Sequence, residues 1–336
     1  MISKGLPKVS FIIPTLNASH ILPKCLTAIR NQEYPVKKIE IIVADGGSTD
    51  NTVRIAKEFR AIVIPNPDIL HEPGKSRASR IATGELLFYT DADNILAESN
   101  WLSLMVAPSL GHPKVLGFLP QTTAPPDSNT LDQYLGNLFT DPFTWFVYGP
   151  LANPMDYPRV YKPIITKKNY RIYKFSKRNY PLFGLSQGVG TRRSFSRDGI
   201  SYADDLLAGI KLIREGGLIA HIPRARIYHY HVSGLSNFAR KYTWRVRNNI
   251  QQKIQRMGLV NRLQFFDRWK KIRMYLFIPY ALTLIFPIID TVILCVKYRS
   301  LVMLWHIPAS FIIAAIVLKE YISNIFKIRR SVGTYE

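Results

Sequence analysis

The chain has 336 residues, of which 47% are hydrophobic, and 45 lysines and arginines against 23 acidic residues give it a formal charge of +22. The apolar content excludes a disordered chain, since it is enough for a packed core. The charge predicts an anionic partner, such as a nucleic acid, an acidic membrane surface or a phosphorylated substrate. Two cysteines, Cys25 and Cys295, are too few for a disulfide framework or a zinc motif, which fits a reducing compartment. The amino-terminal residues form no apolar stretch, so we expect no cleaved signal peptide.

Strand-like and helix-like runs alternate along the first 90 residues. Apolar runs typical of strands are residues 9–13, 39–44, 61–64 and 86–90, and residues 21–29, 51–59 and 76–82 are expected to form helices between them. Such alternation predicts an α/β fold with a doubly wound, mainly parallel sheet. The site of such a sheet lies at the carboxyl ends of its strands.

Two carboxylates one residue apart, Asp91 and Asp93, directly follow the run 86–90. Two negative charges at the end of a buried strand are unfavourable unless a cation or a solvated cleft receives them. An Asp-x-Asp triplet can offer Mg²⁺ or Mn²⁺ one or two oxygen ligands and leave the other positions to a diphosphate. The alternative is a polar turn that Asn94 caps.

Further polar residues lie at the ends of neighbouring elements. Asp45 follows the second strand and can accept hydrogen bonds from a nucleotide base or ribose. Gly46 and Gly47 would let the backbone approach a planar base. Lys75 and Arg77, at the start of a helix, offer positive charge for a diphosphate. Taken singly, Asp45 could cap a turn and the two cations could be surface charges, but their order on alternating elements favours a nucleotide site.

Asp204 and Asp205 begin another expected helix, and two histidines follow it. A carboxylate in the first helical turn is favoured by the helix dipole. Two carboxylates exceed what a cap needs, so one could be a general base that takes a proton from an acceptor hydroxyl. His229 and His231 alternate along an expected strand and would share a face. Either could supply a third metal ligand or a diphosphate donor, and a structural role is equally open.

The C-terminal third combines basic and apolar segments. A helix from Phe238 to Met257 carries an apolar stripe with lysines and arginines on its other faces. This pattern is typical of a helix on anionic headgroups, although an ordinary packed helix is the alternative. Two apolar runs, 274–296 and 301–318, are each long enough to cross a bilayer. Their basic flanks predict a hairpin with both ends cytoplasmic. The alternative is a pair of buried or in-plane helices. Asp290, in the first run, could face a partner or a lipid headgroup, or lie close to an interface.

The order of these motifs resembles the family 2 glycosyltransferases, which are inverting enzymes with the GT-A fold. The resemblance covers about residues 7–232. The matching segments are Pro14-Thr15-Leu16-Asn17, Asp45-Gly46-Gly47-Ser48-Thr49-Asp50-Asn51-Thr52, Ala82-Thr83-Gly84-Glu85 before Asp91-Ala92-Asp93, Gly188, Asp204-Asp205, and Pro223-x-Ala225-x-Ile227-x-His229.

The resemblance implies a UDP- or GDP-linked sugar donor, a divalent cation (Mn²⁺ or Mg²⁺) and inversion at the anomeric carbon. The residues that would bind the donor are Pro14, Thr15, Asn17, Asp45, Gly47, Lys75, Arg77 and Asp91. The residues that would hold the metal are Asp93, Asp91 and His229. Asp205 would be the catalytic base, with Asp204 beside it in the catalytic pair.

Taken together, these patterns predict the domain order and the setting of the protein. We expect a GT-A domain over 1–235 with a substrate- or membrane-facing insertion at 120–185, basic interfacial helices at 236–272, two transmembrane helices within 273–326 and a basic tail at 327–336. The protein would be a multi-pass protein of the cell membrane with its catalytic domain in the cytoplasm. Its partners would be an anionic membrane surface and a lipid-linked acceptor, a polyprenyl phosphate or a glycolipid, and not a nucleic acid.

Three positions depart from the family pattern. Lys75-Ser76 stands where the family often has Arg-Asn, and Asp204-Asp205 where it usually has Glu-Asp. Arg240-Lys241-Tyr242-Thr243-Trp244 is the nearest match to the Gln-x-x-Arg-Trp motif of many membrane members, which favours transfer of single sugars over processive synthesis. The alternatives are a polysaccharide-type glycosyltransferase, a nucleotidyltransferase that releases pyrophosphate, and a non-catalytic basic protein that binds membranes or nucleic acid.

Overall fold

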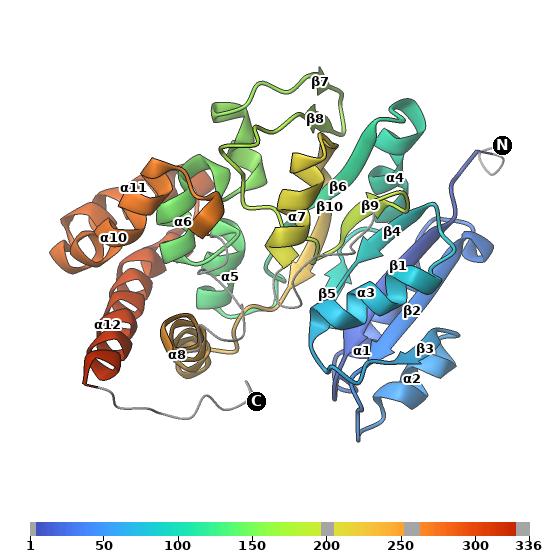
Figure 1. The fold of residues 1–336 in the computed structure, drawn as a ribbon, viewed down its shortest axis with the longest axis horizontal. Coiled ribbons are helices and arrows are strands. Elements are labelled where there is room, and N and C mark those ends of the chain that lie inside the picture. The colour runs from blue at the N-terminus through green and yellow to red at the C-terminus, as the bar shows by residue number, and fades with distance from the viewer. Residues whose placement is uncertain (1–4, 196–204, 252–262, 327–336) are drawn as a thin grey trace. The chain divides into compact units, whose positions relative to one another are not determined.

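The chain folds into two compact units, seen in a computed structural model that describes residues 5–195, 205–251 and 263–326 (Figure 1). Unit 1 comprises Met1–Thr122 and Tyr157–His229, and unit 2 comprises Thr123–Asp156 and Tyr230–Glu336. Three predicted features lie outside the described residues: Asp204, the end of the helix expected to reach Met257, and the basic tail 327–336.

A mixed sheet forms the centre of unit 1. Its described strands follow the order β3-β2-β1-β4-β9-β6-β10-β8-β7, and β5 pairs with β10. Their bounds are β1 Val9–Thr15, β2 Ile39–Asp45, β3 Ile62–Pro65, β4 Leu86–Tyr89, β5 Asn94–Leu96, β6 Val115–Thr123, β7 Ile165–Thr166, β8 Arg171–Tyr173, β9 Val189–Arg192 and β10 Leu218–His229. Strands β3, β2, β1 and β4 pair in parallel, whereas β9 pairs antiparallel to β4. The predicted mainly parallel α/β sheet is confirmed.

Helices connect the parallel strands as the sequence predicts. Those of unit 1 are α1 Leu22–Arg30, α2 Thr52–Glu58, α3 His71–Ile81, α4 Trp101–Gly111 and α7 Asp205–Arg214, with a 3-10 turn η1 at Val36–Lys38. The apolar stripe of α1 is fully used, since Leu22, Cys25, Leu26 and Ile29 are all buried. Helix α3 begins five residues earlier than the expected Ser76, at His71. Pro73 is tolerated there because the first helical turn leaves its N–H groups without a helical partner.

An aromatic cluster holds together the strands that carry the polar loops. Phe11 of β1, Phe88 of β4 and Trp101 of α4 are fully buried. Their ring centroids lie 5.5 to 6.3 Å apart. Such aromatic pairs add about 0.5–1.5 kcal/mol each beyond the burial of their area. The cluster therefore keeps β1 and β4, and with them the loops at their carboxyl ends, in fixed positions.

Unit 2 is helical in its described part. Its helices are α5 Thr130–Leu138, α6 Pro142–Tyr148, α8 Leu235–Gln251, α10 Arg268–Thr283, α11 Ile285–Tyr298 and α12 His306–Ile325, with 3-10 turns η2 Gly149–Leu151, η3 Pro154–Arg159, which continues into unit 1, η5 Leu263–Phe265 and η6 Leu301–Trp305. Residues 123–156, which the sequence places in an insertion of the first domain, pack with these C-terminal helices instead. Leu131, Leu135 and Leu138 share one apolar core with Phe277 and Ile313, which explains the grouping.

The first apolar run is broken. Where the sequence predicts one helix over 274–296, α10 and α11 meet at an angle of 93°. Leu284, between them, has a left-handed backbone (φ 59°). In one unbroken helix Pro287 would be an interior residue without an N–H for the carbonyl of Thr283, at a cost of about 3 kcal/mol, whereas here it lies in the first turn of α11. By length and composition, one described segment, Leu301–Ile325, could cross a membrane, and the bent pair could be a second if it forms one span.

Asp290 of α11 turns into unit 2 rather than outward. Its Oδ2 accepts a hydrogen bond of 2.8 Å from the Tyr280 hydroxyl, which also lies 2.9 Å from Nε2 of His306. Tyr280 therefore accepts from an Nε2–H, so Nδ1 of His306 accepts from the Tyr134 hydroxyl at 2.8 Å. The four side chains form one directed chain of hydrogen bonds that links α5, α10, α11 and α12.

Candidate active site

The Asp45 carboxylate organises the loop that follows β2. It accepts hydrogen bonds from the backbone N–H of Gly47 (3.0 Å) and of Ser48 (2.9 Å). The hydroxyls of Ser48 (2.6 Å) and Thr15 (3.2 Å) also donate to it. Gly47 has φ 92°, a conformation that glycine adopts without strain. Asp45 thus caps this turn, and its contact with a nucleobase stays a prediction.

The loops after β1 and β2 are tied to each other. Asn17 has φ 46°, its side-chain oxygen accepts from the N–H of Thr49 at 2.9 Å, and its own N–H donates to Ser48 Oγ at 2.8 Å. Pro14 and Thr15 are the last residues of β1 and are buried. Of the residues expected to bind the donor here, Asn17 and Gly47 therefore shape the loops, and Pro14 and Thr15 form their base.

Lys75 is a buried cation beside the acidic triplet. Its side chain is 2% exposed, and its Nζ lies 3.3 Å from Asp91 Oδ1 and 3.2 Å from Glu72 Oε1. Asp91 Oδ1 is buried and makes no hydrogen bond with the residues that the structure describes, so its contact with Lys75 is a charge interaction rather than an aligned hydrogen bond. Two carboxylates compensate the buried ammonium group. The sequence places Lys75 near the triplet, and the structure brings the two together.

Arg77, two residues further on, is arranged differently. Its Nη2 and Nε donate to Asp68 Oδ2 at 2.8 and 3.3 Å, and both side chains of this pair are largely exposed. An exposed ion pair of this kind contributes about 0–1 kcal/mol. Arg77 would have to leave Asp68 to reach a diphosphate, so its role in donor binding stays a prediction.

Asn94 organises the Asp91–Asp93 turn. Its Oδ1 accepts from the N–H of Asp91 at 3.1 Å, and its own N–H donates to the Asp91 carbonyl at 3.0 Å. Its Nδ2 donates to Asp93 Oδ1 at 3.0 Å. The Asn94 side chain is buried, whereas that of Asp93 is 39% exposed. The polar turn and the metal site, which are alternatives on the sequence, are therefore compatible, because the cap directs Asp93 towards solvent.

The side-chain amide of Asn94 also determines which ring nitrogen of His229 carries the proton. His229 ends β10 opposite Asn94 of β5, and its Nδ1 lies 2.9 Å from Asn94 Nδ2 and 3.5 Å from Asp93 Oδ1. Since Asn94 Oδ1 is used by Asp91, the amide presents N–H to Nδ1, so Nδ1 accepts and the proton lies on Nε2. In this arrangement His229 is a donor through Nε2, which favours the diphosphate role over that of a metal ligand.

His231 does not share this position. The prediction that His229 and His231 lie on one face of a strand is wrong, because β10 ends at His229. His231 belongs to unit 2, where its backbone N–H donates to Asp132 Oδ1 at 2.7 Å.

Asp205 opens α7 and is held by a short segment before β9. Its Oδ2 accepts a hydrogen bond of 2.6 Å from Ser186 Oγ, and its carbonyl accepts from the N–H of Leu185. At Gly184 any side chain would lie 2.3 Å from Oδ2, so only glycine fits without displacing the carboxylate. Gly188 (φ 76°) donates its N–H to the carbonyl of Tyr89 at 2.7 Å. The segment thus joins the expected base to the end of β4, which precedes the acidic triplet.

Sequence reasoning misses Asn94 as an organiser, and Ser186 and Gly184 altogether. Asn94 is visible only as a cap, since its contact with His229 spans 135 positions of the chain. Ser186 and Gly184 belong to a segment with no periodic pattern, and nothing in their spacing marks them.

The acidic triplet suits a hard divalent cation. The described residues contain no group of three or more His, Cys, Asp or Glu side chains that could hold a metal alone. The triplet offers the buried Oδ1 of Asp91, which contacts Lys75, and the exposed carboxylate of Asp93. Oxygen ligands of this kind fit Mn²⁺ or Mg²⁺ when a diphosphate supplies further ligands. Burial, and to a smaller extent the charges of Asp93 and Asp91, raises the pKa of the nearby Cys25 thiol above its usual value.

Residues 10–200 match the model of Glycosyl transferase family 2, and the chain belongs to this family. The "PGL/p-HBAD biosynthesis glycosyltransferase" of Mycobacterium bovis (strain BCG / Pasteur 1173P2) is 36% identical over 107 residues, which are 30% of this chain and 41% of that protein. "Glycosyltransferase AglE" of Haloferax volcanii is 39% identical over 95 residues, 26% of this chain and 31% of that protein. The chain therefore spans less than half the length of these curated relatives.

A solved structure supports the fold. The crystal structure of S. aureus TarS 1-349 superposes with a TM-score of 0.50 at 13% identity, over 98% of this chain and 95% of that chain. The family match and this likeness confirm the resemblance and the GT-A fold that the sequence predicts.

Proposed function

We propose that this chain is a metal-dependent inverting glycosyltransferase of the hexosyltransferase type. It moves a sugar from a UDP- or GDP-linked donor to a lipid-linked acceptor at a membrane surface. The observation that carries the proposal is the buried Lys75 beside Asp91, next to an Asp93 that Asn94 directs to solvent. Together these side chains provide opposite charges at one strand end, as a diphosphate with its cation requires.

Each residue of the site has its own role in an in-line displacement. Asp91 and Asp93 would hold the cation, which, when bound, neutralises the charge that develops on the leaving diphosphate. Lys75 compensates the charge of Asp91 and holds it in place, and His229 donates through Nε2 to a diphosphate oxygen. Asp205 takes the proton of an acceptor hydroxyl as its oxygen bonds to the anomeric carbon and the bond to the diphosphate breaks. An acceptor that is itself a phosphate is already ionised and needs no base.

Membrane attachment is supported by the apolar surface of unit 2 and by the charge of +22. A cytoplasmic catalytic unit next to such a surface can meet an acceptor whose lipid part stays in the bilayer. The acceptor therefore belongs to this proposal: a polyprenyl phosphate or a glycolipid.

Titration calorimetry with UDP and GDP, with and without Mn²⁺, tests the donor site. We expect binding that requires Mn²⁺ and weakens at least about 100-fold in Asp93→Ala, since the variant removes a charged ligand. Glu58→Ala, at an exposed carboxylate on α2, is the matched control and should bind as the parent does. Binding that is independent of Mn²⁺, or unchanged in Asp93→Ala, contradicts the proposal.

A screen of nucleotide-sugars with the purified protein in lipid then identifies the donor. Release of nucleoside diphosphate supports the transferase. Consumption of a nucleoside triphosphate with release of pyrophosphate would instead identify a nucleotidyltransferase.

A further inference from the structure

We infer that unit 2 binds the membrane from one side: the apolar faces of α10, α11, η6 and α12 lie in one anionic leaflet, and none of these helices crosses the bilayer. The inference deepens the proposed membrane attachment and depends on it. It differs from the transmembrane hairpin that the sequence alone predicts.

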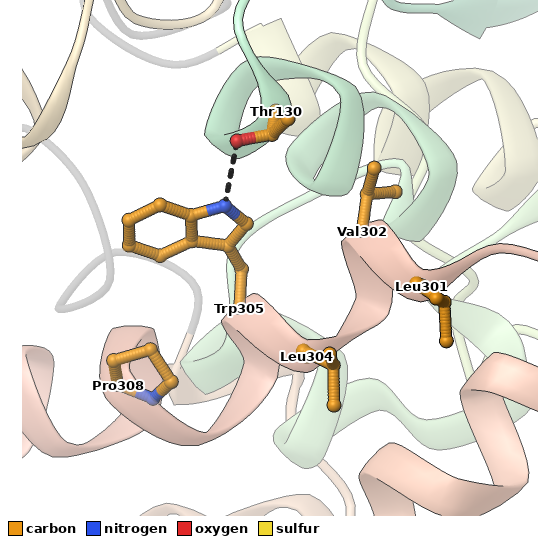
Figure 2. A pocket seen from close by; sticks show the side chains of 6 residues that line it. All are labelled: Thr130, Leu301, Val302, Leu304, Trp305 and Pro308. Atoms are coloured by element: carbon orange, nitrogen blue, oxygen red, sulfur yellow. Dashed lines mark hydrogen bonds between the residues drawn. The ribbon is translucent and has the colours of Figure 1, made fainter.

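Helix α11 exposes apolar side chains along its length. Those with about half or more of their surface exposed are Ile285, Phe286, Ile288, Ile289, Val292, Ile293 and Val296. A contiguous apolar face of this kind marks a membrane or protein interaction site. A shallow groove of about 440 Å³ adjoins η6 and the start of α12, lined by Leu301, Leu304 and Pro308. In Figure 2 the indole of Trp305 lies at this groove, held by a 3.0 Å hydrogen bond to Thr130.

The first apolar run is too short in each of its halves to span. Helices α10 and α11 have 16 and 14 residues, which is about 24 and 21 Å at 1.5 Å per residue, against about 30 Å of hydrocarbon. The bend of 93° between them turns one relative to the other. If one helix follows the membrane normal, the other lies close to the plane.

Helix α12 is long enough to span, but it is packed against a basic helix. Glu320 of α12 is fully buried and accepts hydrogen bonds of 3.0 and 2.9 Å from Arg247 of α8. The two helices pack together, and Arg240 and Arg245 of α8 are exposed. If α12 crossed the bilayer, α8 would be drawn with it, and arginines are costly in hydrocarbon.

The opposite side of α12 is apolar. Leu304, Pro308, Phe311 and Ala315 recur at helical spacing and are exposed, and Lys319 follows them. The packed side of α12 combines core residues such as Ile313 with the buried Glu320, so only its outer, apolar side is left to contact a membrane.

Charge and aromatic residues around the apolar face fit a lipid leaflet rather than a second copy of the chain. Trp269 and Tyr275 are 72% and 75% exposed at α10, and such side chains favour the headgroup region. Lys271 and Arg299 are exposed near the helix ends, where they meet anionic headgroups. A second copy would bring the same positive charges into opposition.

Cysteine labelling in the full-length chain tests the topology. In a Cys295→Ser background, single variants Arg54→Cys (unit 1), Arg299→Cys and Glu336→Cys are treated with a membrane-impermeant maleimide, in intact cells and in inverted membrane vesicles. We expect all three to be labelled only in inverted vesicles, since a chain that never crosses the bilayer exposes every position on one side of it. Labelling of Arg299→Cys in intact cells indicates a spanning hairpin, and labelling of Glu336→Cys indicates that α12 crosses; either result overturns the inference.

A binding assay tests the surface itself. Vesicles of phosphatidylcholine with phosphatidylglycerol should bind Ile289→Glu at least about tenfold less tightly than the parent, because an ionised group enters the apolar face. Ile81→Glu on α3, at an isoleucine of similar exposure (45% against 49%), is the matched control and should bind as the parent does. Equal binding of all three proteins, or a stable dimer that does not bind vesicles, overturns the inference.

Both experiments are repeated with Asp93→Ala, which should give the parent's labelling and vesicle binding, and Mn²⁺-dependent nucleotide binding is measured on the parent. If the inference fails while Mn²⁺-dependent nucleotide binding persists, the proposed transferase stands and only the topology is wrong. If nucleotide binding fails while labelling is one-sided, the inferred topology stands and the proposed transferase is wrong.

Discussion

The two units contain polar networks built from similar side chains, and the networks end differently. In unit 2, hydrogen bonds run from Tyr134 through His306 and Tyr280 to Asp290 inside the helical core. In unit 1, Asn94 links His229 to Asp93, whose carboxylate is 39% exposed. A network whose side chains bond to one another within a helical unit specifies packing, whereas one that ends in exposed charge is available to a ligand. Changes in the first should therefore alter stability, and changes in the second should alter binding.

The largest effect is expected at the buried cation Lys75, because it contributes both to stability and to nucleotide binding. Lys75→Met leaves Asp91 and Glu72 without their shared counter-ion, and removing one partner of a buried ion pair costs about 3–5 kcal/mol. Nucleotide binding should be lost as well. Arg77→Met on the same helix is the control: its pair with Asp68 is exposed, so we expect a loss of about 1 kcal/mol or less. Denaturant unfolding and calorimetry measure both quantities. A loss of binding in Arg77→Met would show that this guanidinium leaves Asp68 for the donor.

Tyr280→Phe breaks the chain of hydrogen bonds in unit 2 and keeps the ring of the side chain. It removes one hydrogen bond from Asp290 and one from His306, whose bond to Tyr134 remains, and we expect this to cost about 1–3 kcal/mol of stability. Thermal unfolding in detergent measures the loss. Nucleotide affinity should equal that of the parent, and a large change in it would contradict the separation between the two networks.

His221 is a buried histidine of unit 1, and we expect it to make the stability of the protein depend on pH. Both ring nitrogens lack a hydrogen-bond partner among the described residues, and burial, then the charge of Arg171, lowers the pKa of His221 from 6.5 to about 3. Above pH 6.5 the group is neutral in both states and contributes no pH dependence. Between pH 6.5 and 3 only the unfolded state takes up the proton, so stability falls by about 1.4 kcal/mol per pH unit as the pH decreases.

His221→Phe removes this contribution. The slope of stability against pH over that range, measured by denaturant unfolding, should be smaller in the variant than in the parent. Identical slopes would show that other groups account for the acid sensitivity.

The smallest effect is expected at Ser186, which positions Asp205. Ser186→Ala removes a hydrogen bond to the charged carboxylate, so the pKa of Asp205 should rise and the acid limb of kcat should move to higher pH. We expect kcat to fall about tenfold with KM for the donor unchanged, and Ser186→Thr to restore both. Ser109→Ala, which removes a buried hydroxyl that donates to the Val106 carbonyl, is the control. A change in KM alone, with an unmoved pH profile, would assign Ser186 a role in binding instead.

The sequence by itself determines the parallel half of the sheet and the position of its polar loops. Alternating apolar runs place Asp45 and the Asp91–Asp93 triplet at strand ends, and parallel strands bring their carboxyl ends to one edge. These inferences succeed because they depend on local periodicity. The same locality sets their limit, since periodicity does not say which distant residues meet.

Only the tertiary structure pairs Lys75 with Asp91 and Arg77 with Asp68, although the two cations are separated by a single residue on one helix. Side chains two positions apart on a helix point in different directions, so their partners depend on packing. Only the structure ends β10 at His229, brings Asn94 to its ring and places Ser186 on Asp205. Hydropathy likewise finds the apolar run 274–296, but it does not show whether the run forms one straight helix. The left-handed backbone of Leu284 and the proline at 287 divide the run into two helices at an angle.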